Sequence, residues 1–215
     1  MNRRLHRNSV VLIHGIFDTH RVFDDMASYL RSHGWQVHSL DLIPNNGDKG
    51  LDKLAEQVAN YIALSFTPTE TLDLVGFSMG GVVSRYYVQR LGGIKRIQRL
   101  VNISAPNHGT AIAYFPQNIS GKQMRPRSQF LRDLNRDVAM LEKINYTYIW
   151  TPFDLMIVPP TSSKMPVGEE VILPVGLHPW MLTDSRCIES VAAALSQPLV
   201  GKGKIGSSIH SECNC

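Results

Sequence analysis

The sequence has no long hydrophobic run and contains few cysteines and aromatic residues. No stretch approaches the roughly eighteen consecutive apolar residues that a transmembrane helix needs. Only three cysteines occur in 215 residues, and Cys213 and Cys215 lie at the very end. This spacing offers no disulfide framework and lacks the second Cys/His pair of a zinc site. The lack of a long apolar run argues against a transmembrane helix. The number and spacing of the cysteines exclude a small domain stabilised by disulfide bonds or by zinc.

Charge is also modest and widely scattered. Lys and Arg number 22 against 18 Asp and Glu, which gives a formal net charge of +4, and 43% of the residues are hydrophobic. A nucleic-acid-binding protein usually concentrates its basic residues on one face, so no nucleic-acid partner is predicted. Two local basic clusters, in residues 95–99 and 122–127, are interpreted as solvated surface rather than as anion sites.

The N-terminal residues are basic but not hydrophobic. Arg3, Arg4 and Arg7 precede the first apolar run, which begins at Val10, and no signal-peptide hydrophobic region comes before it. We therefore expect a cytoplasmic protein. The basic tip is suited to transient contact with an anionic membrane surface, and no obligate protein partner is evident.

Short apolar runs alternate with longer amphipathic ones along the chain. This alternation predicts an α/β fold with a mostly parallel sheet and helices on both faces. We expect one domain over residues 1–200 and a disordered tail over 201–215, which is rich in Gly, Ser and Lys. The predicted strands are residues 10–13, 37–42, 71–75, 97–103, 146–150 and 171–175, and the predicted helices are residues 21–31, 51–63, 82–91 and 187–195.

The most specific motif is Gly-Phe-Ser-Met-Gly-Gly at residues 76–81, between a predicted strand and a predicted helix. A strand that turns into a helix within about two residues leaves no room for side chains beside the apex, which explains the glycines. Ser78 occupies that apex, so its hydroxyl is predicted to be a nucleophile.

Acyl transfer also needs two N–H groups that bind the developing oxyanion. Met79, at the start of the helix, supplies one of them. The second should come from another loop at the same edge of the sheet, and the strand that ends in His14-Gly15 provides such a loop. We assign the Ile16 N–H as the second donor, with the Phe17 N–H as the alternative.

Together with Ser-Ala-Pro-Asn-His-Gly-Thr at residues 104–110, these motifs resemble the α/β-hydrolases, and most closely the small bacterial lipases and esterases. The resemblance covers about residues 10–195 and implies the α/β-hydrolase fold. It also implies a triad whose members follow one another along the chain in the order nucleophile, acid, histidine.

This order places the acid and the base after Ser78. Asp154, in a loop after a predicted strand, resembles the family's acid, and His178, in Gly-Leu-His-Pro, resembles its histidine. Asp184 is a weaker acid candidate because it follows His178. His14 and His108 are interpreted as bracing residues, since neither has the expected place in the chain order.

The resemblance implies a serine hydrolase that cleaves carboxyl esters of aliphatic acids through an acyl-enzyme, with a small-molecule or lipid ester as substrate. A thioesterase or acyltransferase on the same triad, or a non-catalytic binding protein, remains open. No metal or organic cofactor is expected. Residues 115–127 are a candidate lid, although a connecting loop is the favoured interpretation. The predicted pocket residues are Phe17, Tyr114, Phe115, Leu155 and Met156.

Asp18 departs from the pattern, because a carboxylate near an oxyanion hole repels the charge that develops there. We expect it to point away or to bind a neighbouring amide.

Overall fold

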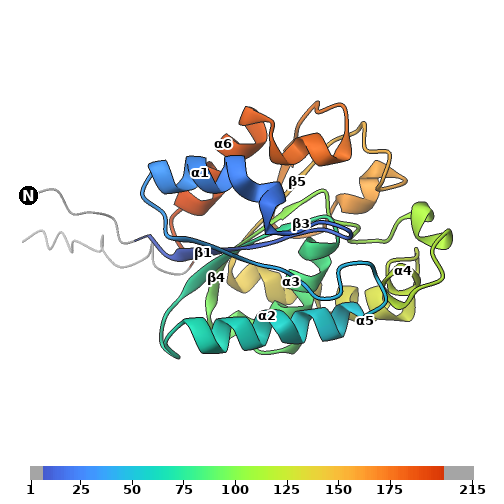
Figure 1. Cartoon of the computed structure of the whole chain (residues 1–215), viewed down its shortest axis with the longest axis horizontal. Helices are drawn as coiled ribbons and strands as arrows, with labels where there is room; N and C mark the ends of the chain where they lie inside the picture. Colours follow the sequence, from blue (N-terminus) through green and yellow to red (C-terminus); the bar gives the residue numbers. More distant parts are fainter. Residues whose placement is uncertain (1–6, 201–215) are drawn as a thin grey trace, which may run out of the picture.

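A six-stranded sheet in which all paired strands run parallel forms the centre of the protein (Figure 1). The computed structural model describes residues 7–200, so the predicted tail and the basic residues Arg3 and Arg4 lie outside the described residues. Across the sheet the strand order is β2-β1-β3-β4-β5-β6. The strands are β1 (Ser9–Ile13), β2 (Val37–Leu40), β3 (Leu72–Phe77), β4 (Ile97–Ile103), β5 (Asn145–Trp150) and β6 (Glu169–Ile172).

Helices cover both faces of this sheet and bury a separate apolar layer on each side (Figure 1). One face carries α1 (Asp24–Ser32) and α6 (Ser185–Ser196). The other carries α2 (Leu51–Ser65), α3 (Met79–Arg90) and α5 (Gln129–Arg136), and the short α4 (Ile119–Gln123) lies next to α5. The predicted α/β-hydrolase architecture is therefore confirmed.

Strand β1 shows how the sequence pattern fills both layers. Val11 and Ile13 pack with α2 and α3, whereas Val10 and Leu12 pack with α1 and α6. Successive side chains of a strand point to opposite faces, so a strand buried on both sides must be apolar throughout. This is why Val-Val-Leu-Ile, at residues 10–13 of β1, is a continuous apolar run rather than an alternating one.

Two predicted strand ends were wrong. Residues 37–42 were expected to form a strand, but β2 ends at Leu40, and the Leu42 N–H donates to His14 Nε2 (2.9 Å) instead of to a strand. The last strand was placed at residues 171–175 and is observed as Glu169–Ile172. Pro174 has no N–H to donate and does not extend the strand, while an edge strand accommodates Glu169 and Glu170 because one of its sides is open to solvent.

The topology determines where a site forms. From β1 the chain crosses to β2 on one side, and β3 then pairs with the other side of β1. In open parallel sheets, a crevice forms at the carboxyl ends of the two strands where the connections diverge. That point lies between Ile13 and Phe77, directly before the loops that carry Ile16 and Ser78.

Candidate active site

Ser78 lies at a strained turn between β3 and α3. Its backbone has φ +54° and ψ −123°, a conformation that L-residues rarely adopt. The turn is held from both sides, since the Ser78 N–H donates to Ile103 O (2.8 Å) and Ser78 O accepts from the Gly81 N–H (3.0 Å). Strain of this kind persists only where the surrounding structure enforces it, and it is concentrated at functional sites.

The flanking glycines are required by close backbone contacts. A Cβ on Gly76 would lie 2.6 Å from the Gly81 Cα, and a Cβ on Gly80 would overlap the carbonyl oxygen of Ile13. The first turn of α3 therefore packs directly against the end of β1. This packing explains why the motif needs glycine on both sides of the serine.

Asp154 and His178 are brought together from loops after β5 and β6. His178 Nδ1 lies 2.7 Å from Asp154 Oδ2, and both side chains are buried. The other carboxylate oxygen, Oδ1, accepts the N–H groups of Met156 and Ile157, each at 2.9 Å. Asp154 is thus fixed by its own turn and presents one oxygen to the imidazole.

The His178 ring also packs against β3. Its centroid lies 4.7 Å from the ring centroid of Phe77, the residue directly before Ser78. The loop that bears Asp154 is tied to the loop before His178, because Thr151 Oγ1 donates to Val175 O (2.6 Å). These contacts hold the acid and the imidazole at the same edge of the sheet as Ser78.

The backbone around Ile16 distinguishes the two candidate oxyanion donors. The Phe17 N–H donates to Asn45 O (2.8 Å), so it is already engaged. Within residues 7–200, no hydrogen bond is donated by the N–H groups of Ile16 or Met79. Ile16 and Met79 are therefore the pair of N–H groups open to a ligand beside Ser78.

Asn45 is a site-supporting residue that the sequence analysis missed. Besides accepting the Phe17 N–H, it donates through Nδ2 to Asp18 O (2.6 Å) and so holds the loop after β1 on both sides of the turn. No motif in the sequence indicates this role, because Asn45 belongs to a polar turn 28 residues away from Phe17. Phe17 itself has φ +62°, a strained conformation that this clamp maintains.

His14 braces the loop, in agreement with the interpretation made from the sequence. It is fully buried, Nε2 accepts the Leu42 N–H (2.9 Å), and Nδ1 lies 2.7 Å from Gly15 O. Since Nε2 accepts, Nδ1 carries the proton and the ring is neutral. The imidazole has no free nitrogen for catalysis.

Asp18 lies beside the nucleophile. A Cβ built on Gly15 would be 2.8 Å from Asp18 Oδ2 and 3.1 Å from Ser78 Cβ. The carboxylate and the serine side chain therefore both lie next to this glycine. Burial raises the pKa of the Asp18 carboxyl above its usual range, while the neighbouring His14 and His178 act in the opposite direction. Asp18 therefore does not point away. Its hydrogen bond with the Gly15 backbone, which also acts to lower the carboxyl pKa, agrees with the other expectation, that it binds a neighbouring amide.

An apolar cavity of about 210 Å³ opens next to Ser78. Of the predicted pocket residues, Phe17, Phe115 and Met156 line it. Tyr114 and Leu155 are not among its lining residues, and the Arg125 guanidinium lies over the Tyr114 ring. The remaining lining residues are Ile16, Pro106, Thr110, Ile112, Ala113, Pro116, Gly121, Met124 and Ile157.

Residues 115–127, the candidate lid, form a wall of this cavity and include α4. The segment is tied to the turn at residues 46–51: the Ser120 N–H donates to Gly47 O (2.9 Å), and Asn118 Nδ2 donates to Asn46 O (2.9 Å). Gln123 Oε1 accepts the Leu51 N–H. The favoured interpretation, a connecting loop, did not anticipate the helix.

The remaining candidates lie away from this cluster. Asp184 is the N-cap of α6 and pairs with Arg186 on the surface, with 2.6 Å between its Oδ2 and Arg186 Nη2. His108 follows β4 and contacts Asn135. Burial, aided by nearby Arg85, lowers the pKa of the His108 imidazole below its usual value.

Among residues 7–200, no group of three or more His, Cys, Asp or Glu side chains has the arrangement of a metal site. In the same part of the chain, no helix combines the length and apolar character needed to cross a bilayer.

The fold and the strained serine turn define a class, and comparison with known proteins agrees with it. A family profile described as the alpha/beta hydrolase fold matches residues 8–180. The chain belongs to this family.

Two triacylglycerol lipases, from Pseudarthrobacter phenanthrenivorans and Burkholderia plantarii, are each 29% identical to the chain over 122 residues, which is 53% of the chain. The matches span only 37% and 33% of those lipases. Among solved structures, Aspergillus fumigatus lipase B superposes with a TM-score of 0.73 at 18% identity, over 89% of this chain and 53% of that one. Mature Bacillus licheniformis lipase BlEst2 superposes with a TM-score of 0.71 at 14% identity, over 88% of this chain and 92% of that one.

Proposed function

We propose that the protein is a serine hydrolase that cleaves carboxyl esters of aliphatic acids through a Ser78-His178-Asp154 triad. The observation that carries this proposal is the buried 2.7 Å contact between Asp154 and His178, at the same sheet edge as the strained Ser78 turn. The similarity to triacylglycerol lipases supports the choice of an ester as substrate.

In the acylation step, neutral His178 removes the proton from the Ser78 hydroxyl as its oxygen attacks the ester carbonyl carbon. Asp154 holds the Nδ1 proton, so that Nε2 is the basic nitrogen, and stabilises the imidazolium that forms. The N–H groups of Met79 and Ile16 bind the oxyanion, and each such donor contributes about 3 kcal/mol to transition-state stabilisation. His178 then protonates the leaving alcohol.

In the deacylation step, the same groups act on water. His178 removes a proton from the water, whose oxygen attacks the acyl-enzyme carbonyl. Collapse of the second tetrahedral intermediate returns the proton to Ser78 and releases the carboxylic acid.

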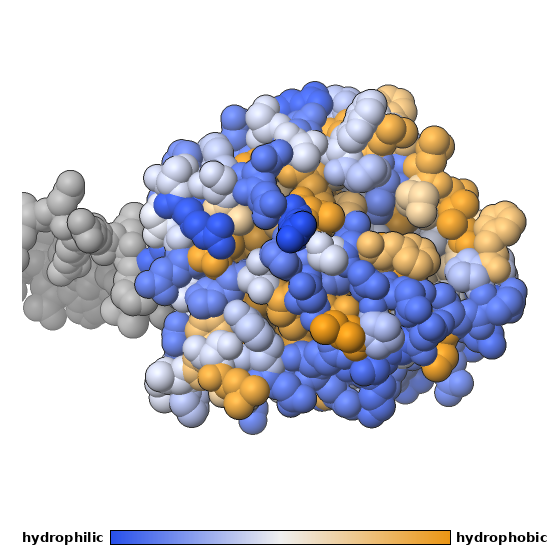
Figure 2. Space-filling view, in the orientation of Figure 1, coloured by the Kyte–Doolittle hydropathy of each residue, from blue (hydrophilic) through white to orange (hydrophobic). Residues whose placement is uncertain are grey.

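The shape and surroundings of the cavity favour an apolar acyl group. Its walls are almost entirely hydrocarbon, and hydrophobic side chains continue onto the surface around it: Phe17, Phe115, Phe153, Leu155 and Trp180 are all more than half exposed. Figure 2 shows hydrophobic residues gathered at the end of the molecule where the loops beside α4 lie. An exposed apolar patch of this kind fits a lipid ester better than a small polar one.

The direct test is labelling with a fluorophosphonate, which reacts with activated serines, followed by peptide mapping. Label on Ser78, together with loss of chromogenic ester hydrolysis in Ser78→Ala, is the expected result. Labelling at another serine, or undiminished turnover by Ser78→Ala, would overturn the proposal.

A further inference from the structure

A second hollow, here called the basic groove, lies on the far side of the loop that follows β4. Its volume is about 690 Å³. One wall comes from the loop bearing His108 and the other from α5. It is lined by His108, Pro126, Arg127, Leu131, Arg132, Asn135 and Arg136.

Two adjacent segments, residues 108–110 and 124–126, separate the basic groove from the catalytic cavity. The Thr110 N–H donates to Met124 O (3.0 Å), and Gly109 packs so closely on Pro126 that a Cβ there would lie 2.6 Å from its nitrogen. Thr110 and Met124 line the cavity, whereas His108 and Pro126 line the groove. The two hollows therefore share a wall.

The cations of the basic groove have little acidic compensation. Among the ion pairs of residues 7–200, none involves Arg127 or Arg132. Arg136 comes only within 3.9 Å of Asp133, a carboxylate that already binds Arg90 at 3.0 Å. Arg132 and Arg136 are also four residues apart on one face of a short helix, where like charges repel.

A fully buried cation lies next to the basic groove, in contact with one of its lining residues. Arg85 is completely excluded from solvent and contacts no carboxylate; it donates to Asn107 Oδ1 (3.1 Å) and to Asn135 Oδ1 (2.8 Å). Its Nε has no hydrogen-bond acceptor. Burial lowers the pKa of the guanidinium to about 10, so it remains charged at neutral pH. Since Asn135 lines the groove, this uncompensated charge adds to the field there.

Two further features concern residues that line the basic groove. Asn135 Nδ2 lies 3.4 Å from His108 Nδ1, which places the imidazole beside Asn135 at the groove. Arg127 has φ +61°, a conformation that is costly for arginine and is found here at the groove itself. Its sequence neighbour Arg125, by contrast, is used internally and donates to Ala113 O.

We propose that the basic groove is an anion site that binds a phosphate group. Arginine guanidinium groups match the oxygens of phosphate in pairs of parallel hydrogen bonds. Three arginines line an open hollow, and a buried arginine lies behind them. This arrangement suits a group with more than one negative charge. This site is independent of the ester reaction, although a phosphate held there lies next to the acyl cavity.

The phosphate has two possible sources, a free phosphate ion or a lipid headgroup. Both are tested on the full chain carrying Ser78→Ala, which prevents turnover of lipid. Calorimetric titration with inorganic phosphate measures the first. Cosedimentation with phosphatidylcholine vesicles, with and without phosphatidic acid, measures the second.

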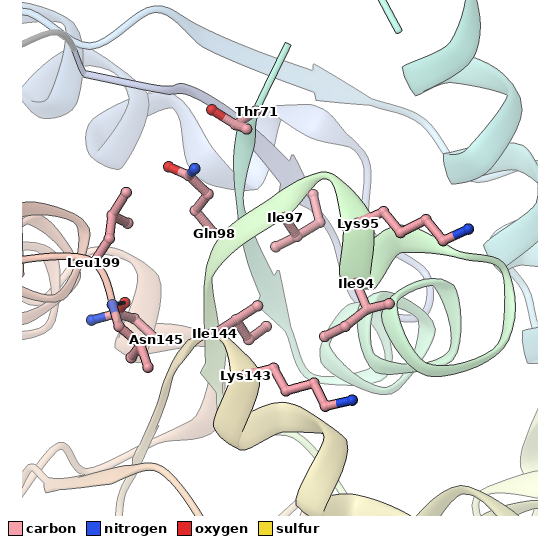
Figure 3. Close-up of a pocket in the computed structure, with 10 residues that line it drawn as sticks. Thr71, Ile94, Lys95, Ile97, Gln98, Lys143, Ile144, Asn145 and Leu199 are labelled. Atoms are coloured by element: carbon pink, nitrogen blue, oxygen red, sulfur yellow. Dashed lines mark hydrogen bonds between the residues drawn. The ribbon is translucent and has the colours of Figure 1, made fainter. Parts of the chain in front are cut away.

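The test variant combines Arg127→Gln, Arg132→Gln and Arg136→Gln. The matched control removes the same charge elsewhere through Arg21→Gln, Lys95→Gln and Lys143→Gln. Lys95 and Lys143 belong to a different hollow at the opposite, amino-terminal end of the strands, beside Ile97 and Asn145 (Figure 3). Circular dichroism and thermal melting check that each triple variant folds.

We expect the groove variant to bind at least about tenfold more weakly, since several charge-assisted hydrogen bonds are lost, and the control to retain binding. Binding of phosphate in solution identifies a free-ion site, whereas groove-dependent binding to phosphatidic acid vesicles alone identifies a lipid headgroup. The proposal would be overturned if both triple variants lost the same amount of binding affinity, or if neither inorganic phosphate nor phosphatidic acid vesicles bound to the protein. No turnover is measured, so the result stands apart from that of the Ser78 experiment.

Discussion

Gly80 packs its α-carbon against the Ile13 carbonyl oxygen, so the first turn of α3 lies directly on the end of β1. A methyl group at this position would also lie 2.5 Å from His14 O. The backbone atoms it meets belong to the strand that delivers the loop with Ile16.

Gly80→Ala is therefore expected to lower the free energy of unfolding by about 1–3 kcal/mol, the usual cost of overpacking. It should also reduce ester hydrolysis, because β1 and α3 must move apart. Urea denaturation measures the first effect. Gly176→Ala is the control: its Cβ would meet only Trp180, at 3.4 Å, and its stability should change little. Equal stability of Gly80→Ala and the wild type would show that this contact relaxes without cost.

Asp154→Asn should leave the fold intact and reduce kcat by about ten-thousandfold, because an amide no longer holds the Nδ1 proton of His178. Steady-state kinetics on a chromogenic ester measures the loss. Asp184→Asn serves as the control, since this residue caps α6 on the surface and still caps it as an amide. If the two variants were equally active, Asp154 would not be the acid of the triad.

Asp18→Asn should shift the pH dependence of hydrolysis. Burial raises the pKa of the Asp18 carboxyl, so this group is neutral below its raised pKa and negatively charged above it. An ionised carboxylate beside Ser78 repels the oxyanion, so Asp18→Asn should lose the decrease in kcat/KM that the wild type shows as the pH rises through that pKa.

Asp41→Asn is the matched control for this shift. Its carboxylate is on the surface, bound to His20, and approaches only the far nitrogen of His14 at 3.9 Å. A pH profile of kcat/KM that is unchanged in Asp18→Asn, or that changes equally in both variants, would contradict an effect of the Asp18 charge on the oxyanion.

Ala113→Leu should narrow the acyl cavity. Ala113 is buried in the cavity wall, where the cavity volume of about 210 Å³ leaves room for the larger side chain. Since one methylene in an apolar pocket changes kcat/KM by about tenfold or more, long-chain esters should lose most and short-chain esters least. A series of p-nitrophenyl esters measures this, with the exposed Ala139→Leu as control. A uniform loss at all chain lengths would argue that the acyl chain binds elsewhere.

Much of the fold was predictable because local rules and tertiary packing agree. Residues 10–13 of β1 are all apolar because both faces of the strand are covered, and the glycines around Ser78 follow from the sharp turn itself. The prediction failed for β6, where an exposed edge strand lacks that apolar pattern. It also failed for Tyr114 and Leu155, because nearness in sequence to the site does not determine which way a side chain points.

The amino-acid sequence by itself determined the six strands, the helices α1, α2, α3 and α6, and the position of the strained serine, since these depend on interactions between residues close in the chain. Only the tertiary structure decided that Asn45 engages the Phe17 N–H, that Asp18 faces the nucleophile, and that Arg85 stands uncompensated behind a basic groove. Each of these relationships depends on contacts between residues far apart in the sequence or on the direction that the backbone gives to a side chain. Burial and charge at such places are set by packing rather than by local pattern.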